Sequence, residues 1–283
     1  MPRLLMMEGN TAEKRARGAA LKVRSSSEIY LLAVKAHFPE LEVDVVNAAD
    51  PAPVGAIPHG RMLADYDGII ITGSSLHAYD PEFAVTNQIA MVKEAGALGK
   101  PMFGSCWGLQ IAVMAAGGRV EYSAKGREVG IARKITLNEA GRAHPMFRAK
   151  PPVFDATCIH YDEVTRMPEG ATLLASNAHS KVQAAVVPLG KSDVWAVQYH
   201  PEFDLAQLVQ LYTLYADDMI AQGFFADTAA LEAYVKTLSA LVAKPDDAGL
   251  AWQLGVDEDV LDDHIRNAEI IAWIETQVLA KAA

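Results

Sequence analysis

The sequence has only two cysteines in 283 residues, Cys106 and Cys158, too few for a disulfide framework. It also lacks a long apolar run. The N-terminal run extends only from Leu4 to Met7, too short for a signal peptide, and no segment approaches the ~18–20 apolar residues of a membrane span. We therefore expect free thiols, a reducing cytoplasmic location and no membrane partner.

Basic residues are scarce as well. Lysine and arginine total 25, against 35 aspartates and glutamates, which gives a formal net charge of −10. Because binding to phosphate backbones requires a basic surface, we exclude nucleic acid as a direct partner. The one basic run, residues 14–17, is interpreted as a solvated loop in a long connection after the first strand. A contact near the rim of an active site is the alternative.

Patterns for holding metals and nucleotides are missing too. The histidines do not show the spacing of metal ligands, so no metal site is predicted. Leu189–Ser192 ends like a phosphate-binding loop, but such a loop requires glycine where Ala185 stands. We therefore expect no cofactor.

Against these absences, the segment 100–116 is the most informative. A short apolar run leads into Gly104–Gly108 (GSCWG), and an apolar segment of helical character follows. Glycines on both sides of Cys106 allow the sharp strand-to-helix turn of a nucleophile elbow, which exposes the side chain above a sheet. The N-terminus of the following helix favours the thiolate, the form that attacks carbon. A buried structural cysteine is the alternative for this motif alone.

A second motif lies near residue 200. Residues 194–199 have the composition of a buried strand and run directly into His200-Pro201-Glu202. Residues two apart in an extended segment project to the same side, so His200 and Glu202 can act together. The carboxylate would fix the imidazole tautomer while the other ring nitrogen faces Cys106, which is the arrangement of a nucleophile, a base and an orienting acid.

Together the two motifs resemble the class I glutamine amidotransferase family, which carries G-x-C-x-G-x-Q at the elbow and a late H-P-E. Here they read GSCWGLQ over residues 104–110 and HPE over residues 200–202. The resemblance covers roughly residues 1–222. It is strongest to the amidotransferase half of GMP synthase, with which residues 126–130 (GREVG) share an R-E-x-G segment.

The resemblance implies roles for individual residues. The backbone N–H groups of Trp107 and of Gly73 or Ser74 would form an oxyanion hole, in which one donor is worth roughly 3 kcal/mol of barrier. The implied catalytic triad is Cys106, His200 and Glu202. The residues implied in binding the glutamyl group are Gly108, Gln110, His160, Tyr161 and Asp162.

The sequence departs from the family pattern where substrate is recognised. Tyr161 stands where the family often has glycine, and Ile159 where it often has serine or asparagine. Ser74 and Ser75 replace the commoner Gly-Pro of the oxyanion loop. These departures concern the identity of the substrate more than the chemistry.

The chemistry that the resemblance implies is hydrolysis or transfer of the side-chain amide of glutamine or of a γ-glutamyl compound, through a thioester. Three interpretations stay open. The protein is a stand-alone hydrolase or transferase, a glutaminase subunit that delivers ammonia to a separate synthetase, or a non-catalytic regulator that retains the fold. The intact triad weighs against the regulator.

Strands alternate with helices along most of the sequence, which predicts an α/β fold with a mostly parallel sheet and helices on both faces. The resemblance implies that this sheet is flavodoxin-like. Among the predicted strands are residues 3–7, 42–46 and 67–72. The predicted helices include residues 25–37, capped by Ser26 or Ser27, and residues 82–98, 205–221, 228–243 and 258–280.

Composition changes near Gly223, beyond which alanine, leucine and acids dominate. We predict an amidotransferase-like catalytic domain over residues 1–222 and a helical C-terminal extension over residues 223–283. The helical periodicity of the extension favours a cap packed against the catalytic domain. A substrate lid and a homodimerisation arm are the alternatives.

Overall fold

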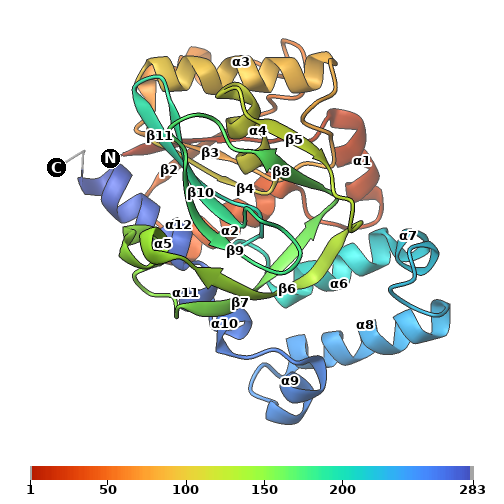
Figure 1. Ribbon diagram of the computed structural model, residues 1–283. Helices are drawn as coiled ribbons and strands as arrows, with labels where there is room; N and C mark the ends of the chain where they lie inside the picture. Colours follow the sequence, from red (N-terminus) through yellow and green to blue (C-terminus); the bar gives the residue numbers. More distant parts are fainter. Residues whose placement is uncertain (1, 281–283) are drawn as a thin grey trace.

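The computed structural model describes residues 2–280, which form a nine-stranded sheet with helices on both faces (Figure 1). The strands of this sheet are β1 (Arg3–Met7), β2 (Glu42–Val46), β3 (Gly68–Ile71), β4 (Met102–Ser105), β6 (Glu128–Leu137), β7 (Val153–His160), β9 (Thr172–Ser176), β10 (Ala184–Leu189) and β11 (Ser192–Val197). Their order is β2-β1-β3-β4-β11-β10-β9-β6-β7. A separate antiparallel pair consists of β5 (Arg119–Tyr122) and β8 (Asp162–Arg166).

The five strands from β2 to β11 pair in parallel, and the strands from β11 to β7 pair in antiparallel fashion. Only β6 and β10 of the nine run against the others, so the predicted mostly parallel α/β sheet is confirmed. Parallel pairing brings the carboxyl ends of β3, β4 and β11 to one edge. Ligands of open α/β sheets bind at that edge.

Strand residues alternate between two hydrophobic cores on opposite faces of the sheet. In β1, Leu4 and Met6 belong to one core and Leu5 and Met7 to the other, and all four are fully buried. This is the pattern of a strand covered on both sides. The covering helices are α2 (Ser26–His37) and α12 (Ala268–Trp273) on the Leu4 face and α3 (Phe83–Ala97) and α4 (Trp107–Ala115) on the Leu5 face.

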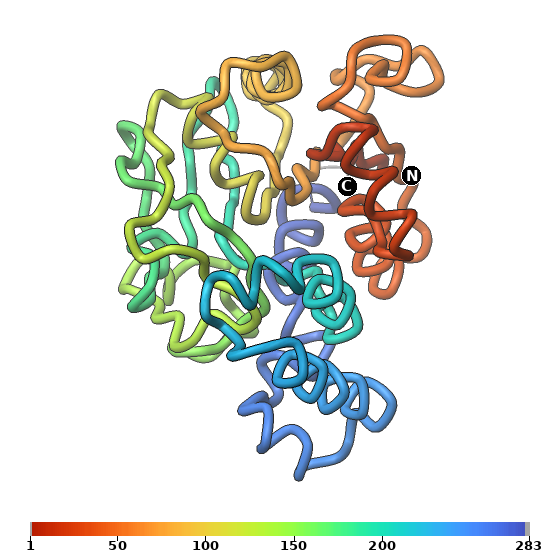
Figure 2. The backbone as a smooth tube through the Cα atoms, turned by 90° about the vertical axis from the view of Figure 1, so that its right-hand side faces the viewer, coloured from red at the N-terminus to blue at the C-terminus, as the bar shows by residue number. Residues whose placement is uncertain are grey.

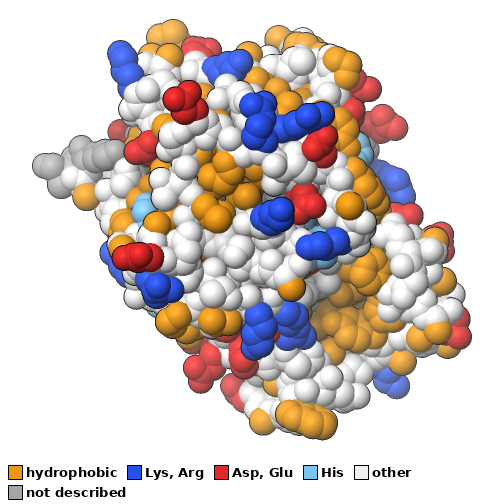
Figure 3. All heavy atoms as spheres, in the orientation of Figure 1, with side chains coloured by type: hydrophobic (Ala, Val, Ile, Leu, Met, Phe, Trp, Pro, Cys, Tyr) orange, Lys and Arg blue, Asp and Glu red, His pale blue; other side chains and the backbone are white. Residues whose placement is uncertain are grey.

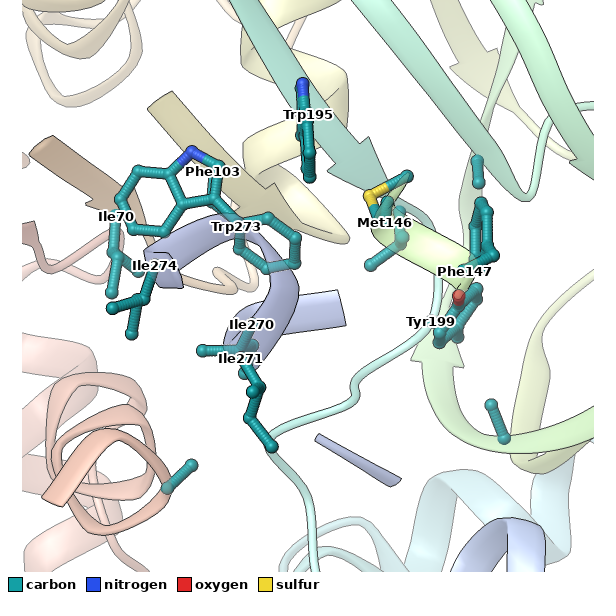
Figure 4. Close-up of a cluster of buried hydrophobic side chains, with 14 of the residues drawn as sticks. Ile70, Phe103, Met146, Phe147, Trp195, Tyr199, Ile270, Ile271, Trp273 and Ile274 are labelled. Carbon is teal, nitrogen blue, oxygen red and sulfur yellow. The ribbon is translucent and has the colours of Figure 1, made fainter. Parts of the chain in front are cut away.

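Helix α12, together with the start of the helical turn that follows it, is built into the core of the Leu4 face. Ile270, Trp273 and Ile274 are at most 1% exposed and pack among strand side chains (Figure 4). The Trp273 and Phe103 rings have their centres 5.9 Å apart. A Cβ on Gly68 in β3 would lie 2.9 Å from the Trp273 ring, so glycine is needed for this approach. The predicted C-terminal helices are present, and the last of them covers the sheet.

A buried ion pair fixes α12 in place. Glu269 is fully buried, accepts a hydrogen bond from the Tyr199 hydroxyl at 2.5 Å, and lies 3.6 Å from the Lys150 ammonium. Burial raises the pKa of the Glu269 carboxyl, against the opposing influence of Lys150 and Tyr199. The C-terminal helix is thereby attached to the residue that precedes His200.

A third hydrophobic cluster holds the remaining long helices together. Its helices include α6 (Leu205–Leu214), α7 (Ala216–Ala221), α8 (Thr228–Ala243) and α9 (Ala248–Leu254). Helices α8 and α9 lie at one end of the molecule, away from the sheet, in both views (Figures 1 and 2). The shorter segments are α5 (Glu139–Ala143), η1 (Pro58–Gly60), η2 (Leu63–Asp65) and η3 (Pro145–Phe147). Within the described residues, no helix is long and apolar enough to cross a membrane.

Two of the predicted helices are divided into shorter segments in the structure. The predicted helix 205–221 is interrupted at Tyr215, where φ is −109° and ψ is 25°. The predicted helix 258–280 is divided into α10 (Glu258–Leu261), α11 (Asp263–Arg266), α12 and the π-helical turn η4 (Ile274–Leu279). The side chains of Asp257 and Asp262 cap α10 and α11, and these caps start new helices within the predicted one.

Two predictions near the N-terminus are wrong. The cap of α2 is Ser25, in a reciprocal capping box with Glu28, and not Ser26 or Ser27. The basic run 14–17 is not a loop but part of α1 (Ala12–Ala20), which Thr11 caps. No residue of α1 is buried, so the helix has no apolar stripe that a sequence pattern could show.

Candidate active site

Cys106 lies between β4 and α4, at the predicted elbow. Its backbone has φ 50° and ψ −98°, a positive φ that residues other than glycine rarely adopt. The Cys106 N–H donates to the carbonyl of Val197 at 2.8 Å, which ties the elbow to the end of β11. Such strain costs about 1–3 kcal/mol and persists only where the surrounding structure imposes it, as at functional sites.

Close packing explains the glycines of the elbow. A Cβ on Gly104 would lie 2.7 Å from the Cα of Gly108, and a Cβ on Gly108 would lie 2.7 Å from the carbonyl oxygen of Ile71. Strand β4 and helix α4 therefore approach more closely than side chains permit. Gly108, which the resemblance assigns to substrate binding, lies in this packing and is not among the residues that line the cavity at the elbow.

His200 is held rigidly by its neighbours. Its Nδ1 lies 2.7 Å from Oε1 of Glu202, and its ring stacks on Phe203 with centroids 3.8 Å apart. On the other side Gly73 approaches so closely that a Cβ there would lie 2.9 Å from Cε1 of His200. The Nε2 atom is buried and has no hydrogen-bond partner among residues 2–280. The ring nitrogen that would transfer the reacting proton therefore makes no hydrogen bond to the described residues.

Cys106 and His200 line the same cavity, of about 380 Å³, and the Cys106 Sγ lies 3.6 Å from the carbonyl oxygen of Ile159. Burial by itself lowers the pKa of His200. The negative charges of Glu202 and Cys106 outweigh burial and raise that pKa to about 10. We therefore expect His200 to be an imidazolium at neutral pH, in the same cavity as the cysteine that the sequence predicts to attack carbon.

Two hydroxyl groups that the sequence motifs did not indicate support this pair. The Ser105 hydroxyl donates to Oε1 of Glu202 at 2.8 Å. The Thr157 hydroxyl donates to the carbonyl of His200 at 2.6 Å, and the His200 N–H donates to the Thr157 carbonyl at 2.8 Å. Ser105 stands inside the elbow motif, where its position beside Cys106 was a usable signal. Thr157 comes from β7 and gave none.

The predicted oxyanion-hole residues surround the elbow. Gly73 and Ser74 line the cavity, and the Ser74 hydroxyl donates to the carbonyl of Gly9 at 2.8 Å. The hydrogen bonds of the described residues include none from the backbone N–H of Gly73 or Ser74. Trp107 is the first residue of α4, where N–H groups have no acceptor within the helix. These backbone donors are thus available to an oxyanion.

The residues predicted to bind the glutamyl group converge on Asp162. The Gln110 amide donates to the Asp162 carbonyl at 3.1 Å, and Nδ1 of His160 lies 2.9 Å from the same oxygen. The Asp162 carboxylate contacts His77 at 2.7 Å and accepts from the Tyr79 hydroxyl at 3.3 Å. Cavity-lining residues of this group are Gln110, His160, Tyr161 and Asp162. His77 and Tyr79 belong to no motif and were missed.

One cluster, Glu128 with His160 and His179, has side chains that suit a metal, with ligand atoms within 4.8 Å of one another. However, Nε2 of His160 contacts Oε2 of Glu128 directly at 2.9 Å. The amides of Asn177 and Gln183 donate to the same carboxylate at 2.6 and 2.8 Å. The carboxylate is therefore used in hydrogen bonds, and we interpret the cluster as a network that positions His160.

Similarities to known proteins agree with this geometry. The family described as Glutamine amidotransferase class-I matches residues 29–212. The chain belongs to this family. It is 32% identical to a gamma-glutamyl-L-1-hydroxyisopropylamide hydrolase of Pseudomonas sp, over 99% of this chain and 94% of that protein. It is 30% identical to a GMP synthase of Chlorobium luteolum, over 60% of this chain but only 31% of that protein.

A solved structure shows the same fold at low identity. The glutamine amidotransferase of Thermotoga maritima superimposes with a TM-score of 0.62 at 18% identity, over 92% of this chain and 98% of that one. Membership of the class I amidotransferases confirms the predicted family, fold and enzyme class. The roles of individual residues stay predictions, and the distances given above support them.

Proposed function

We propose that this class I amidotransferase is a stand-alone hydrolase of γ-glutamyl amides, with Cys106, His200 and Glu202 as its triad. The observation that carries the proposal is the cavity. From Cys106 it extends to α1 and to α6 and α7, so it has room for an organic amine beyond the glutamyl group. The Pseudomonas relative, which is similar over nearly its whole length, is named for the hydrolysis of such an amide.

The geometry supports a mechanism in two steps. The Cys106 thiolate attacks the γ-carbonyl carbon, and the backbone N–H groups of Trp107 and Gly73 or Ser74 stabilise the resulting oxyanion. His200 passes its proton from Nε2 to the departing amine, and the C–N bond breaks to leave a thioester. Water then attacks the thioester, His200 takes the proton of that water, and glutamate leaves. Glu202 stabilises the imidazolium without exchanging a proton.

A turnover assay with purified protein tests this function. We expect steady release of glutamate from γ-glutamyl methylamide and γ-glutamylglycine, faster than from glutamine, because the cavity accommodates the larger amine. The Cys106→Ser variant is the control and should release none. Turnover of glutamine that requires an added synthetase would contradict the proposal and support the alternative of an ammonia-delivering subunit.

Two further predictions concern the surroundings of the protein. The cytoplasmic location stays a prediction from the cysteine content. A homodimer stays an alternative role for the C-terminal helices, and light scattering of the purified protein would test it.

A further inference from the structure

Arg127, which directly precedes β6, is a buried cation held between aromatic rings. Its side chain is 3% exposed. The guanidinium carbon lies 3.8 Å from the ring centre of Tyr161 and 5.1 Å from that of Tyr215. Its Nη2 donates to the Tyr161 hydroxyl. Stacking and this hydrogen bond together fix the plane of the guanidinium.

This cation has little countercharge. The one acid within ion-pair distance in the described part of the chain is Asp218, whose Oδ2 lies 3.9 Å from Nη2 and whose side chain is 54% exposed. The Nε atom is buried and has no hydrogen-bond partner there, and Nη1 has only the sulfur of Met219, at 4.0 Å. A buried charge is costly unless it is paired and hydrogen-bonded. The site of Arg127 therefore lacks an anion.

Two other arginines of the cavity, Arg15 and Arg24, are better paired. Arg15 contacts Asp50 at 2.8 Å, and Arg24 contacts Asp204 at 2.9 Å. More cations than carboxylates line the cavity, although the protein carries a net charge of −10. Its lining cations are Lys14, Arg15, Arg17, Arg24 and Arg127, and its lining carboxylates are Asp162 and Asp218.

On the face of the molecule shown in Figure 3, lysine and arginine side chains are scattered among acidic ones. A cavity lined by more cations than carboxylates favours substrates that carry a negative charge. Arg127 and Cys106 line this same cavity, so a molecule that contacts the thiol can also contact the guanidinium.

From these observations we infer that Arg127 binds a carboxylate of the γ-glutamyl substrate and thereby selects it. The inference rests on the proposed function. A guanidinium is planar and always charged, and it matches a carboxylate with two parallel hydrogen bonds. The carboxylate is either the α-carboxylate of the glutamyl group or one carried by the amine, as in a γ-glutamyl dipeptide. Tyr161, where the family often has glycine, supports the guanidinium in this role.

Kinetics of Arg127→Met and Arg127→Lys test the inference. Three substrates separate the carboxylates: γ-glutamylglycine has both, γ-glutamyl methylamide has only the α-carboxylate, and 4-amino-N-methylbutanamide has neither. Loss of a charged hydrogen bond predicts a decrease of about 10–100-fold in kcat/KM for Arg127→Met. Arg127→Lys should recover part of it, because it restores the charge without the planar geometry.

The pattern across substrates assigns the carboxylate. An equal loss on γ-glutamylglycine and γ-glutamyl methylamide indicates the α-carboxylate, and a loss confined to γ-glutamylglycine indicates the carboxylate of the amine. Arg61→Met removes an arginine that pairs with Asp44 away from the cavity and should leave kcat/KM unchanged. A folded Arg127→Met that retains kcat/KM within about twofold on all substrates overturns the inference. So does an equal loss on the butanamide.

A binding measurement separates this inference from the proposed function. If the wild type hydrolyses none of the amides, the proposed function fails, but Cys106→Ser can still bind them. γ-Glutamylglycine should then raise the unfolding temperature of Cys106→Ser and not that of Cys106→Ser combined with Arg127→Met. Equal increases in the two proteins would contradict carboxylate binding by Arg127. If Arg127→Met does not fold, Arg127→Lys takes its place and should show a smaller increase.

Discussion

Tyr199 and His200 are consecutive residues, and each contacts a different buried carboxylate. Tyr199 donates to Glu269 at 2.5 Å, and His200 contacts Glu202 at 2.7 Å. Glu269 is 0% exposed and Glu202 is 5% exposed. Each carboxylate also has one oxygen without a hydrogen-bond partner among residues 2–280. By burial and by hydrogen bonding the two sites are alike.

The two carboxylate sites differ in whether the residue that contacts the carboxylate faces a cavity. Around Glu269, the other polar contact is Lys150, and the rest of α12 is packed in the apolar core. Beside Glu202, the imidazole of His200 presents a free nitrogen to a cavity that also contains Cys106. A buried carboxylate therefore indicates a reactive site only where it orients a group that faces a cavity. Elsewhere it serves as an anchor.

The largest effect should separate the residues of the triad. Cys106→Ala and His200→Ala should each lower kcat on a γ-glutamyl amide by on the order of 10⁶, because residues that act as a unit fail together. Glu202→Gln should lose less, about 10⁴, because it orients the base without transferring a proton. Steady-state assays of kcat on the folded variants measure these losses. A Glu202→Gln protein as inactive as Cys106→Ala would contradict the division of roles.

The anchoring carboxylate should affect stability and not turnover. Glu269→Leu leaves the Lys150 ammonium buried without a partner, which should lower the free energy of unfolding by about 3–5 kcal/mol. Adding Lys150→Met should recover much of the loss, because an apolar pair can replace a buried ion pair. Urea denaturation measures both effects. A stable Glu269→Leu protein with greatly reduced kcat would instead give Glu269 a role in the active site.

Much of the fold could be predicted from sequence because its signals are local. Strands β1 and β2 and helix α8 have the predicted bounds, since each carries a clear run or period of apolar residues. The elbow and the H-P-E segment are short motifs on adjacent parallel strands. Parallel pairing of β4 with β11 therefore brings Cys106 and His200 to one cavity, as the two motifs together indicated.

The remainder depends on contacts between distant segments. Arg127 drew attention only as part of a family segment, because its lack of a countercharge arises from its own contacts with Tyr161 and with Asp218 of α7. His77 is a single histidine in a loop of the sequence, and only the fold brings Asp162, 85 positions later, into contact with it. Helix α1 escaped prediction since none of its residues is buried. Patterns along the sequence do not show such contacts between distant residues.

The smallest effect, a shift in pH dependence, distinguishes the two carboxylates most directly. In the wild type the charges of Glu202 and Cys106 raise the pKa of His200 to about 10, against the lowering effect of burial. Protonated His200 thus stabilises the fold fully below its unfolded pKa of about 6.5, and this contribution disappears as the pH rises through about 10. Activity should follow the same proton, since in the proposed mechanism His200 delivers it to the departing amine. We expect kcat/KM to fall only in alkaline solution.

Removing the charge of Glu202 should move that fall to lower pH, because its electrostatic support of the imidazolium is lost. Glu269→Gln should leave the alkaline limb in place, because Glu269 contacts Tyr199 and Lys150 and makes no contact with His200. Profiles of kcat/KM from neutral pH to about 11, with the rate of Cys106 alkylation measured in parallel, report the pKa of the pair. The same limb in both variants would show that Glu202 does not set the protonation of His200. Glu202 and Glu269 would then differ only in that the partner of Glu202 lies beside the cavity.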